Sequence, residues 1–430
     1  GAKANIETKF SGIEANTVAS SAVSGAVSAA VASDAILSDA TTISAASDAS
    51  SAPTPIRTFQ LDVREVGKHI LFALIVGIAT GLASVVLCLC VGWSYDLFSL
   101  APWLVWALPV AGVLELLLYK AFKLPGDLTT HRVVIKIRKD DPVSWLLAPG
   151  ILMATCMSMV CGASVGKEAG ALQIGSSLGA IIGKPFGLHS IYKQNADEPM
   201  DGYASSTGMA ACFAALFFAP LGAAMFVFEL ARYKRSVIKH AGTIILACFV
   251  AFLVSRTIGI GDIINKVDIP NFSWAIVGQI VVVGVAAAIA GSIFDNAIQW
   301  LHDLTWRITR NLYVWVIVGG LLFAVLVTFC GWNHFTGSGG NILNDALAGK
   351  YGTWDFAIKI LLTCICLSFW LKGGEIMPSF CIGGLLGAAC TGITGGSPAL
   401  GAAVGVMSFF AAFSRCPFAA FLLGCEIFGW

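Results

Sequence analysis

The stretch Phe213-Ala-Ala-Leu-Phe-Phe-Ala-Pro220 returns later in the chain as Phe410-Ala-Ala-Phe-Ser-Arg-Cys-Pro417. In each copy a glutamate follows nine residues after the proline, Glu229 in the first copy and Glu426 in the second. A recurrence of this kind predicts that the chain contains an internal repeat.

A second pair of matching stretches lies earlier in each half and in the same order. Ile174-Gly-Ser-Ser-Leu-Gly-Ala180 follows Gly166-Lys-Glu168, and Ile382-Gly-Gly-Leu-Leu-Gly-Ala388 follows Gly373-Gly-Glu375. The two matches predict two homologous transmembrane halves, 59–240 and 272–430, joined by a helix and loop at 241–271. In transporters with such repeats, the substrate site lies where broken helices of both halves meet near the bilayer midplane.

The composition places the chain in a membrane. Of its 430 residues, 57% are hydrophobic and only 12% are charged, whereas soluble domains carry about 25% charged residues. The net charge of +1 provides no field that would attract nucleic acid. A cytosolic enzyme, a nucleic-acid-binding protein and a disordered protein are therefore excluded. Residues 1–58 differ from the rest, because this Ala/Ser-rich stretch has few aromatic residues and predicts a disordered N-terminal tail.

Apolar segments follow one another from Gly67 onward, and several reach the ~20 residues with which a helix spans a bilayer. Others are short or are interrupted, at Ala148-Pro149-Gly150 and at Ala219-Pro220, and the segment 379–394 follows Met377-Pro378. Backbone groups that such breaks release cannot face lipid, so the broken segments must lie inside the protein. The sequence thus predicts an all-α, multi-pass protein whose broken helices surround a pathway, as in a transporter or channel.

Basic residues are concentrated in two short loops, at 120–139 and at 232–239. Because loops rich in Lys and Arg stay in the cytoplasm, both are expected on the inner side of a plasma membrane.

The break Gly162-Ala-Ser-Val-Gly-Lys-Glu-Ala-Gly170 holds the strongest candidate site residue, Glu168. The glycines end one helix and a new helix begins at Glu168, where unpaired N–H groups and the helix dipole favour an anion. An ionised carboxylate at membrane depth is expensive unless such groups stabilise it. We expect the carboxylate and a permeant anion to compete for the same amides, and protonation of Glu168 to release it; a static helix cap is the alternative.

Two further glycine breaks offer backbone amides of the same kind, Lys372-Gly-Gly-Glu-Ile-Met-Pro378 and Thr336-Gly-Ser-Gly-Gly-Asn-Ile342. The thirteen cysteines include no C-x-x-C pair or metal-type Cys/His spacing, so no metal or cofactor is expected.

These motifs together resemble those of the CLC family of chloride channels and proton-coupled anion antiporters. The family pattern G-[KR]-E-G-P is similar to Gly166-Lys-Glu-Ala-Gly170, G-x-F-x-P to Gly374-Glu-Ile-Met-Pro378, and A-P-L-x-G-x-x-F-x-x-E to the stretch from Ala219 to Glu229. The resemblance covers about 65–430. It implies a homodimer of protomers with two inverted repeats, each protomer carrying its own anion path.

The resemblance also implies roles for single residues. Glu168 would be the external gating glutamate and couple anion to proton. The expected anion-binding residues are Gly166, Lys167, Ala169, Gly170, Gly374, Glu375, Ile376 and Met377, with Asp127, Gly337, Ser338 and Gly339 along the path.

Departures from the family pattern bear on the choice of ion. Leu124-Pro-Gly-Asp-Leu-Thr-Thr130 replaces the family's G-S-G-I-P, so the anion-contacting serine is missing, and Leu230 stands where the internal proton-relay glutamate is usual. Glu375 resembles the Gly-Gly-Glu form of the bacterial fluoride-exporting subgroup, which shares both departures. We therefore expect a halide, fluoride or chloride, exchanged for protons, with a passive chloride channel as the alternative. Asp127 fits an anion path only if it is paired or points away.

A hydrolase is the rival from another class, because Gly162-Ala-Ser-Val-Gly166 matches the G-x-S-x-G nucleophile elbow around Ser164. It would require a strand before the serine and a histidine partner. Among the other acids within apolar runs, Glu115 and Asp295 are expected to pair with neighbouring helices, and Glu229 with Arg232 three residues on.

Overall fold

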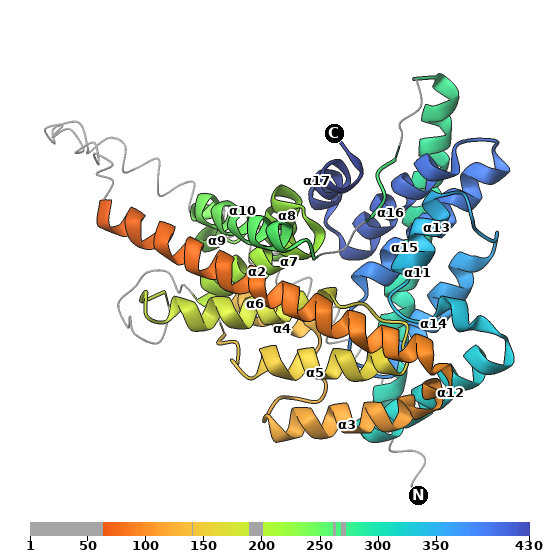
Figure 1. Cartoon of the computed structure of the whole chain (residues 1–430), viewed down its shortest axis with the longest axis horizontal. Coiled ribbons are helices and arrows are strands. Elements are labelled where there is room, and N and C mark those ends of the chain that lie inside the picture. The colour runs from red at the N-terminus through yellow and green to blue at the C-terminus, as the bar shows by residue number, and fades with distance from the viewer. Residues whose placement is uncertain (1–62, 140, 189–200, 261–263, 268–271) are drawn as a thin grey trace, which may run out of the picture. The chain divides into compact units, whose positions relative to one another are not determined.

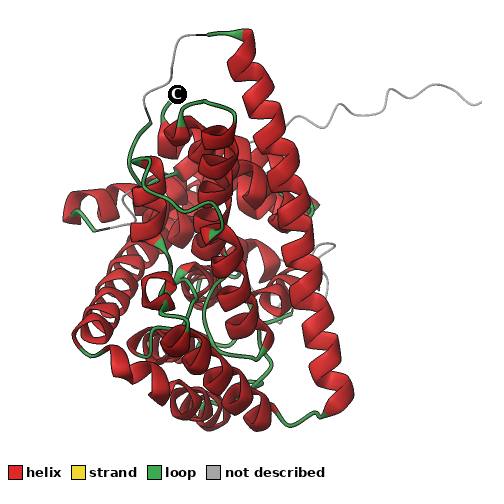
Figure 2. Cartoon of the chain, turned by 90° about the vertical axis from the view of Figure 1, so that its right-hand side faces the viewer, coloured by secondary structure: helices red, strands yellow, loops and turns green. Residues whose placement is uncertain are grey.

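The computed structural model describes residues 63–139, 141–188, 201–260, 264–267 and 272–430. The expected tail at 1–58 lies outside these residues. Within the described part the chain is helical (Figure 2). Extended pairing among the described residues is one isolated bridge, between Gly166 and Gly374. The predicted all-α fold is confirmed.

Two series of seven helices follow one another along the described chain (Figure 1). The first series is α2 (Val63–Leu100), α3 (Leu108–Ala121), α4 (Thr130–Lys139), α5 (Leu147–Val160), α6 (Glu168–Gly183), α7 (Asp201–Phe217) and α8 (Pro220–Leu230). The second series is α11 (Trp274–Ile308), α12 (Leu312–Phe329), α13 (Gly340–Leu347), α14 (Asp355–Ser368), α15 (Ile376–Ile393), α16 (Pro398–Ser414) and α17 (Pro417–Phe428). Between them lie α9 (Arg235–Lys239) and α10 (Ala241–Ile258), and the 3-10 turns are η1 (Pro102–Ala107) and η3 (Trp332–Phe335).

The two series correspond element by element. Each begins with a helix of more than 30 residues, 38 in α2 and 35 in α11, and each ends with a short helix that starts at a proline. The repeated apolar motif falls on α6 and α15, and the repeated proline begins α8 and α17. The sequence repeat therefore coincides with a repeat of helices.

Glycines of the repeated motif bring neighbouring helices together. In the first series a Cβ on Gly175 would overlap the carbonyl oxygen of Gly208, so α6 and α7 approach backbone to backbone. In the second series a Cβ on Gly387 would overlap the carbonyl oxygen of Gly401, so α15 and α16 do the same. Membrane helices without a hydrophobic driving force gain contact through small residues of this kind.

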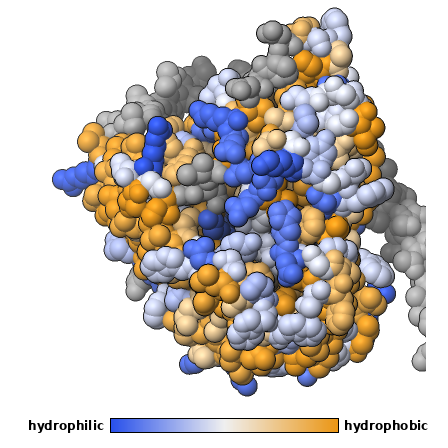
Figure 3. Space-filling view, turned by 45° about the vertical axis from the view of Figure 1, so that its right-hand side comes forward, coloured by the Kyte–Doolittle hydropathy of each residue, from blue (hydrophilic) through white to orange (hydrophobic). Residues whose placement is uncertain are grey.

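Six helical stretches are long and apolar enough to cross a membrane, judged by length and composition: 63–100, 102–121, 241–258, 274–308, 312–329 and 376–393. Most of α11 remains exposed, with large apolar side chains such as Ile289 and Ile293 on its surface. Figure 3 shows broad apolar areas beside a smaller group of hydrophilic residues. In contrast, α15 is almost wholly buried among other helices, as expected for a segment that lines an interior site.

The expected break at Ala219-Pro220 is found, where α7 ends and α8 begins. A break also precedes α15, but it lies before Ile376, so Met377 and Pro378 belong to the first turn of that helix. The interruption expected at Ala148-Pro149-Gly150 is wrong. Pro149 lies in the first turn of α5, where a missing N–H breaks no hydrogen bond, and α5 continues to Val160.

The two basic loops lie against each other. The guanidinium of Arg138, in α4, donates two hydrogen bonds to the carbonyl of Leu230, at 2.9 and 2.6 Å. The ammonium of Lys234 donates to the carbonyl of Arg138 at 3.2 Å. Arg138 thus binds the carboxyl end of α8 and Lys234 binds the carboxyl end of α4, where the helix dipole favours positive charge. Both loops therefore lie on one side of the protein.

Candidate functional site

The glycine breaks of the two halves meet. Gly166 donates its N–H to the carbonyl of Gly374, and Gly374 donates its N–H to the carbonyl of Gly166, both at 2.7 Å. One break precedes α6 and the other precedes α15, so this bridge brings the amino ends of two helices together. The first N–H groups of a helix have no partner within the helix, so the bridge gathers donors from both halves.

Glu168 is the first residue of α6, as predicted, and its side chain is fully buried. Its Oε2 accepts the N–H of Met377, the second residue of α15, at 3.2 Å. A carboxylate of the first half therefore lies on the helix start of the second half. Negative charge is favoured there by the helix dipole and by the N–H donors.

The close approach of Glu168 depends on glycine at two positions. A Cβ on Gly166 would overlap the carboxylate of Glu168. A Cβ on Gly374 would lie 2.7 Å from the backbone nitrogen of Ala169 and 3.3 Å from Oε2 of Glu168. Contacts under 3.0 Å force the structure to shift, so a side chain at Gly374 would move the start of α6.

The other residues expected to bind the anion lie at the two helix starts. Lys167 directly precedes α6 and is half-buried, whereas Ala169 and Gly170 are buried in the first turn of the helix. Glu375 directly precedes α15 and is half-buried, whereas Ile376 and Met377 are buried.

Lys372 joins the second break to the loop that replaces the family's serine motif. Its ammonium donates to the carbonyls of Gly126 and Leu128, at 2.6 and 3.3 Å. Its backbone N–H donates at 3.0 Å to Glu115, which is fully buried and also accepts the hydroxyl of Ser158 at 2.6 Å. Glu115 is therefore paired with neighbouring helices, as expected.

Asp127 is also paired. Its carboxylate forms an ion pair with Arg132 at 2.5 Å, and its side chain retains 20% of its exposure. The arginine compensates the negative charge, which removes the conflict between Asp127 and an anion path.

The third break lies beside the first. Gly337 donates its N–H to the carbonyl of Gly162 at 3.1 Å, so this amide is already bonded to protein. Gly339 is buried and Ser338 is half-buried. Gly337 and Gly339 have φ of +68° and +88°, a conformation that glycine adopts without strain.

Ser164 is held by α14 rather than by a histidine. Its hydroxyl shares a hydrogen bond with the hydroxyl of Thr363 at 2.9 Å, and its N–H donates to the sulfur of Cys366 at 3.3 Å. The segment before it is helix α5, not a strand. The nucleophile elbow that the motif suggested is therefore wrong.

The repeated glutamates cap each other's helices. Glu229 accepts the N–H groups of Phe418 and Ala419, at the start of α17, at 3.3 and 2.7 Å. Glu426 accepts the N–H groups of Leu221 and Gly222, at the start of α8, at 3.1 and 2.7 Å. The local pair of Glu229 with Arg232 that the spacing suggested is replaced by this contact between halves, because unsatisfied N–H groups at a helix start bind a carboxylate strongly.

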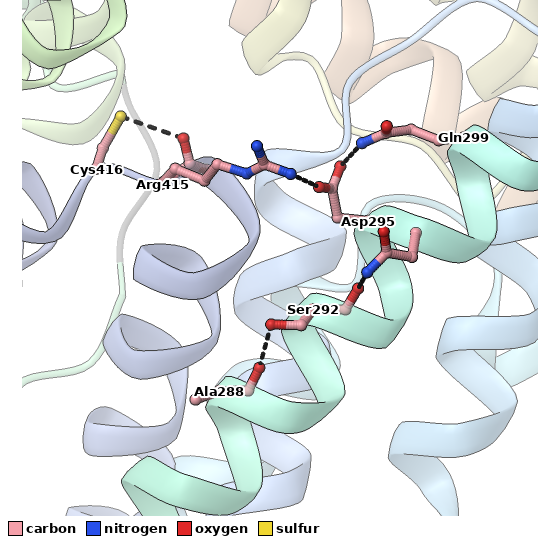
Figure 4. Close-up of polar contacts among 8 residues, drawn as sticks. Ala288, Ser292, Asp295, Gln299, Arg415 and Cys416 are labelled. Atoms are coloured by element: carbon pink, nitrogen blue, oxygen red, sulfur yellow. Dashed lines mark hydrogen bonds and ion pairs between the residues drawn. The ribbon is translucent and has the colours of Figure 1, made fainter. Parts of the chain in front are cut away.

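Asp295 pairs with a neighbouring helix, as expected (Figure 4). Its carboxylate accepts the guanidinium of Arg415, at the end of α16, at 3.0 Å and the side-chain amide of Gln299, one turn further along α11, at 2.7 Å. The arginine is 75% exposed, so the pair lies near the surface.

Sequence reasoning missed the polar face of α14. Lys359 is fully buried there, and its ammonium donates to the carbonyls of Phe335 and Gly337 at 2.9 and 2.7 Å. A single basic residue in an apolar segment is the signal that would have identified it.

Comparison with known proteins finds matches over most of the chain. The family model described as "Voltage gated chloride channel" matches residues 116–430, well over half of the chain. A "Chloride/fluoride channel protein" of Pseudomonas syringae pv. tomato is 28% identical over 384 residues, covering 87% of this chain and 83% of that protein.

Solved structures share the fold. A "CLC-type fluoride/proton antiporter" has a TM-score of 0.76 and 22% identity, covering 85% of this chain and 91% of that one. A "slow cyanobacterial Cl-/H+ antiporter" has a TM-score of 0.72 and 22% identity, covering 84% and 89%. A "eukaryotic CLC transporter" has a TM-score of 0.68 and 16% identity, covering 85% and 68%.

Proposed function

The chain belongs to the voltage gated chloride channel family, a family of membrane anion transporters, and from this premise we propose that it exchanges a halide for protons, gated by Glu168. The halide is fluoride or chloride. The contact between Glu168 Oε2 and the N–H of Met377 at 3.2 Å is the observation that supports the proposal most directly.

The mechanism follows from competition for this amide. The ionised carboxylate occupies the start of α15, where N–H groups and the helix dipole favour negative charge. A halide needs the same donors, so the anion and the carboxylate exclude each other. Protonation of Glu168 removes its charge, weakens the hydrogen bond from Met377 and lets the side chain leave, which links one proton to the entry of the anion.

Fluoride is the first choice of halide. The serine motif of the family is replaced here by the loop 124–130, in which Asp127 is bound to Arg132. The second break contains a carboxyl group, that of Glu375. A fluoride ion is small and strongly hydrated, and a carboxyl donor such as protonated Glu375 would help to replace its water. The solved structure with a TM-score of 0.76 is described as a fluoride/proton antiporter, which supports this choice, and the Pseudomonas relative is described as a chloride/fluoride channel protein, which fits either halide.

The remaining expectations belong to the same proposal. The halves at 59–240 and 272–430 are inverted repeats joined by 241–271, and two protomers form a homodimer in the plasma membrane. The correspondence of the helix series and the reciprocal contacts of Glu229 and Glu426 support the repeats.

The test is anion efflux from liposomes that contain the purified protein, with fluoride, chloride or nitrate inside and the external pH recorded. The wild type should release halide and move protons in the opposite sense. Glu168→Gln should lower proton movement at least about tenfold, because an amide cannot exchange a proton at this site. Glu65→Gln is the control, since this acid is exposed in an ion pair with Lys68.

Three results would contradict the proposal in different ways. Proton movement that persists in Glu168→Gln would remove Glu168 from the gate. Halide release without proton movement in the wild type would establish the alternative, a passive chloride channel. A wild type that releases no halide at all would refute the transport function itself.

A further inference from the structure

Lys359 is a positive charge in the interior of the protein. It is the basic residue of the apolar helix α14 and its side chain is 0% exposed. The ammonium donates to the carbonyl oxygens of Phe335 and Gly337, at 2.9 and 2.7 Å. These carbonyls satisfy two of its protons but carry no net charge.

No carboxylate of the described residues lies within ion-pair distance of this ammonium. Lys372, the other buried lysine of the site, has a buried acid nearby, since Glu115 accepts its backbone N–H at 3.0 Å. A buried ion without a counter-charge is strongly destabilising. An ionisable residue of this kind within a membrane marks an ion pathway by default.

The position of Lys359 links it to the first and third glycine breaks and to α15. Its partner Gly337 belongs to the third break and donates to Gly162 of the first break at 3.1 Å. A Cβ on Gly339 would lie 3.0 Å from Cε of Lys359 and 2.8 Å from the sulfur of Cys381, which belongs to α15. Four residues further along α14, Thr363 binds Ser164 of the first break.

We propose that Lys359 is the fixed positive charge of the anion path, neutralised by the transported halide rather than by a protein carboxylate. It is a positioning residue: it holds the third break through two carbonyls and sets the affinity for halide through its charge. When halide is absent, the carboxylate of Glu168 supplies the compensating negative charge in the path. This inference rests on the proposed function.

Neutralising the charge should weaken halide binding. Opposite unit charges on the order of 10 Å apart, at an effective dielectric constant of about 20, attract enough to change an affinity roughly tenfold. Lys359→Gln retains N–H donors for Phe335 and Gly337 but removes the charge. It should raise the half-saturating halide concentration of efflux roughly tenfold. Thr363→Val changes the same face of α14 without changing charge and should alter that concentration less than about twofold.

A second pair of variants covers the case in which Lys359→Gln does not fold. Cys381→Asp places a carboxylate beside the ammonium and neutralises it in place, whereas Cys381→Asn introduces a side chain of the same shape without charge. The aspartate variant should raise the half-saturating concentration roughly tenfold above the asparagine variant. A second readout, independent of transport, is the halide concentration at which the unfolding temperature of each purified variant has risen by half of its maximal increase.

The outcomes separate the two proposals. If the wild type releases halide and Cys381→Asp behaves like Cys381→Asn in both assays, the role of Lys359 is refuted while the transport function stands. If the wild type releases no halide, the transport function fails first. A shift in Cys381→Asp, with Cys381→Asn close to wild type, supports the fixed charge.

Discussion

Replacing Glu229 or Glu426 by alanine should destabilise the protein by similar amounts, because the two residues make equivalent contacts. Each carboxylate accepts two N–H groups at the start of the other helix, one at 2.7 Å and a longer one at 3.3 or 3.1 Å. A hydrogen bond to a charged group contributes about 1.5–3 kcal/mol, and a helix cap about 1 kcal/mol. Both side chains are half-buried, so solvent screening lowers the sum. We expect a loss of about 1.5–3 kcal/mol for each variant.

The double variant tests whether the two contacts are independent. Each glutamate lies near the end of its own helix and binds the start of the other, so α8 and α17 run antiparallel and the two contacts are separated by about nine residues of helix, on the order of 14 Å. Sites that far apart normally add within about 0.5 kcal/mol. The double variant should therefore lose about 3–6 kcal/mol.

The assay is thermal unfolding of the purified protein in detergent, followed by tryptophan fluorescence. At a few degrees per kcal/mol, each single variant should lower the Tm by roughly 3–6 °C. Glu65→Gln, at an exposed ion pair, should lie within about 1 °C of wild type. A large shift for Glu426→Ala with none for Glu229→Ala would refute the reciprocal arrangement, and so would a double variant no worse than either single one.

Three further predictions concern the site and its surroundings. Gly374→Ala should fold but lose most halide transport, because the new Cβ would lie 2.7 Å from the backbone nitrogen of Ala169. The control is Gly278→Ala, where a Cβ would meet nothing within 4 Å. Equal halide fluxes for the two variants would contradict the packing argument. Ser164→Ala should retain more than about half of wild-type halide flux in liposomes, since its hydroxyl only shares a hydrogen bond with Thr363, whereas a hydrolase nucleophile would lose all activity. Arg415→Ala should lower stability in thermal unfolding by less than about 1 kcal/mol, because the guanidinium that binds Asp295 is largely exposed, and a loss above about 2 kcal/mol would show that this pair matters more than its exposure implies.

The local rules of helix formation were enough to predict many of the elements. The starts of α6 at Glu168 and of α8 at Pro220 follow from a glycine break and from a proline that suits a first turn. The interruption predicted at Pro149 was wrong because a proline breaks a helix only when the residue four positions before it is already helical. The sequence alone did not show that α5 begins at Leu147, two residues before this proline.

The short helices α4 and α13 were not predicted. Each has no more than 10 residues, too few for apolar periodicity to separate it from a loop, and each is stabilised by the helices on which it packs.

The partners of the buried polar groups were beyond the reach of sequence. Glu229 and Arg232 lie three residues apart, a spacing that predicts a local pair, yet Glu229 binds the start of α17 instead. Lys359 and Phe335 are 24 residues apart, and no local pattern connects them. Partners of this kind are chosen by which N–H and C=O groups are left unsatisfied at a helix end or break, and that depends on how distant helices pack.

By itself, the sequence predicted a helical membrane protein with an internal repeat, and glycine breaks at which helices begin. These properties follow from composition, hydropathy and the geometry of glycine and proline, all of which act locally. Only the tertiary structure decided that Gly166 pairs with Gly374, that Glu168 lies on the N–H of Met377, and that Lys359 has no acid of the described residues beside it. Those contacts join residues from opposite halves or separate helices, and the packing of α6, α14 and α15 brings them within hydrogen-bond distance.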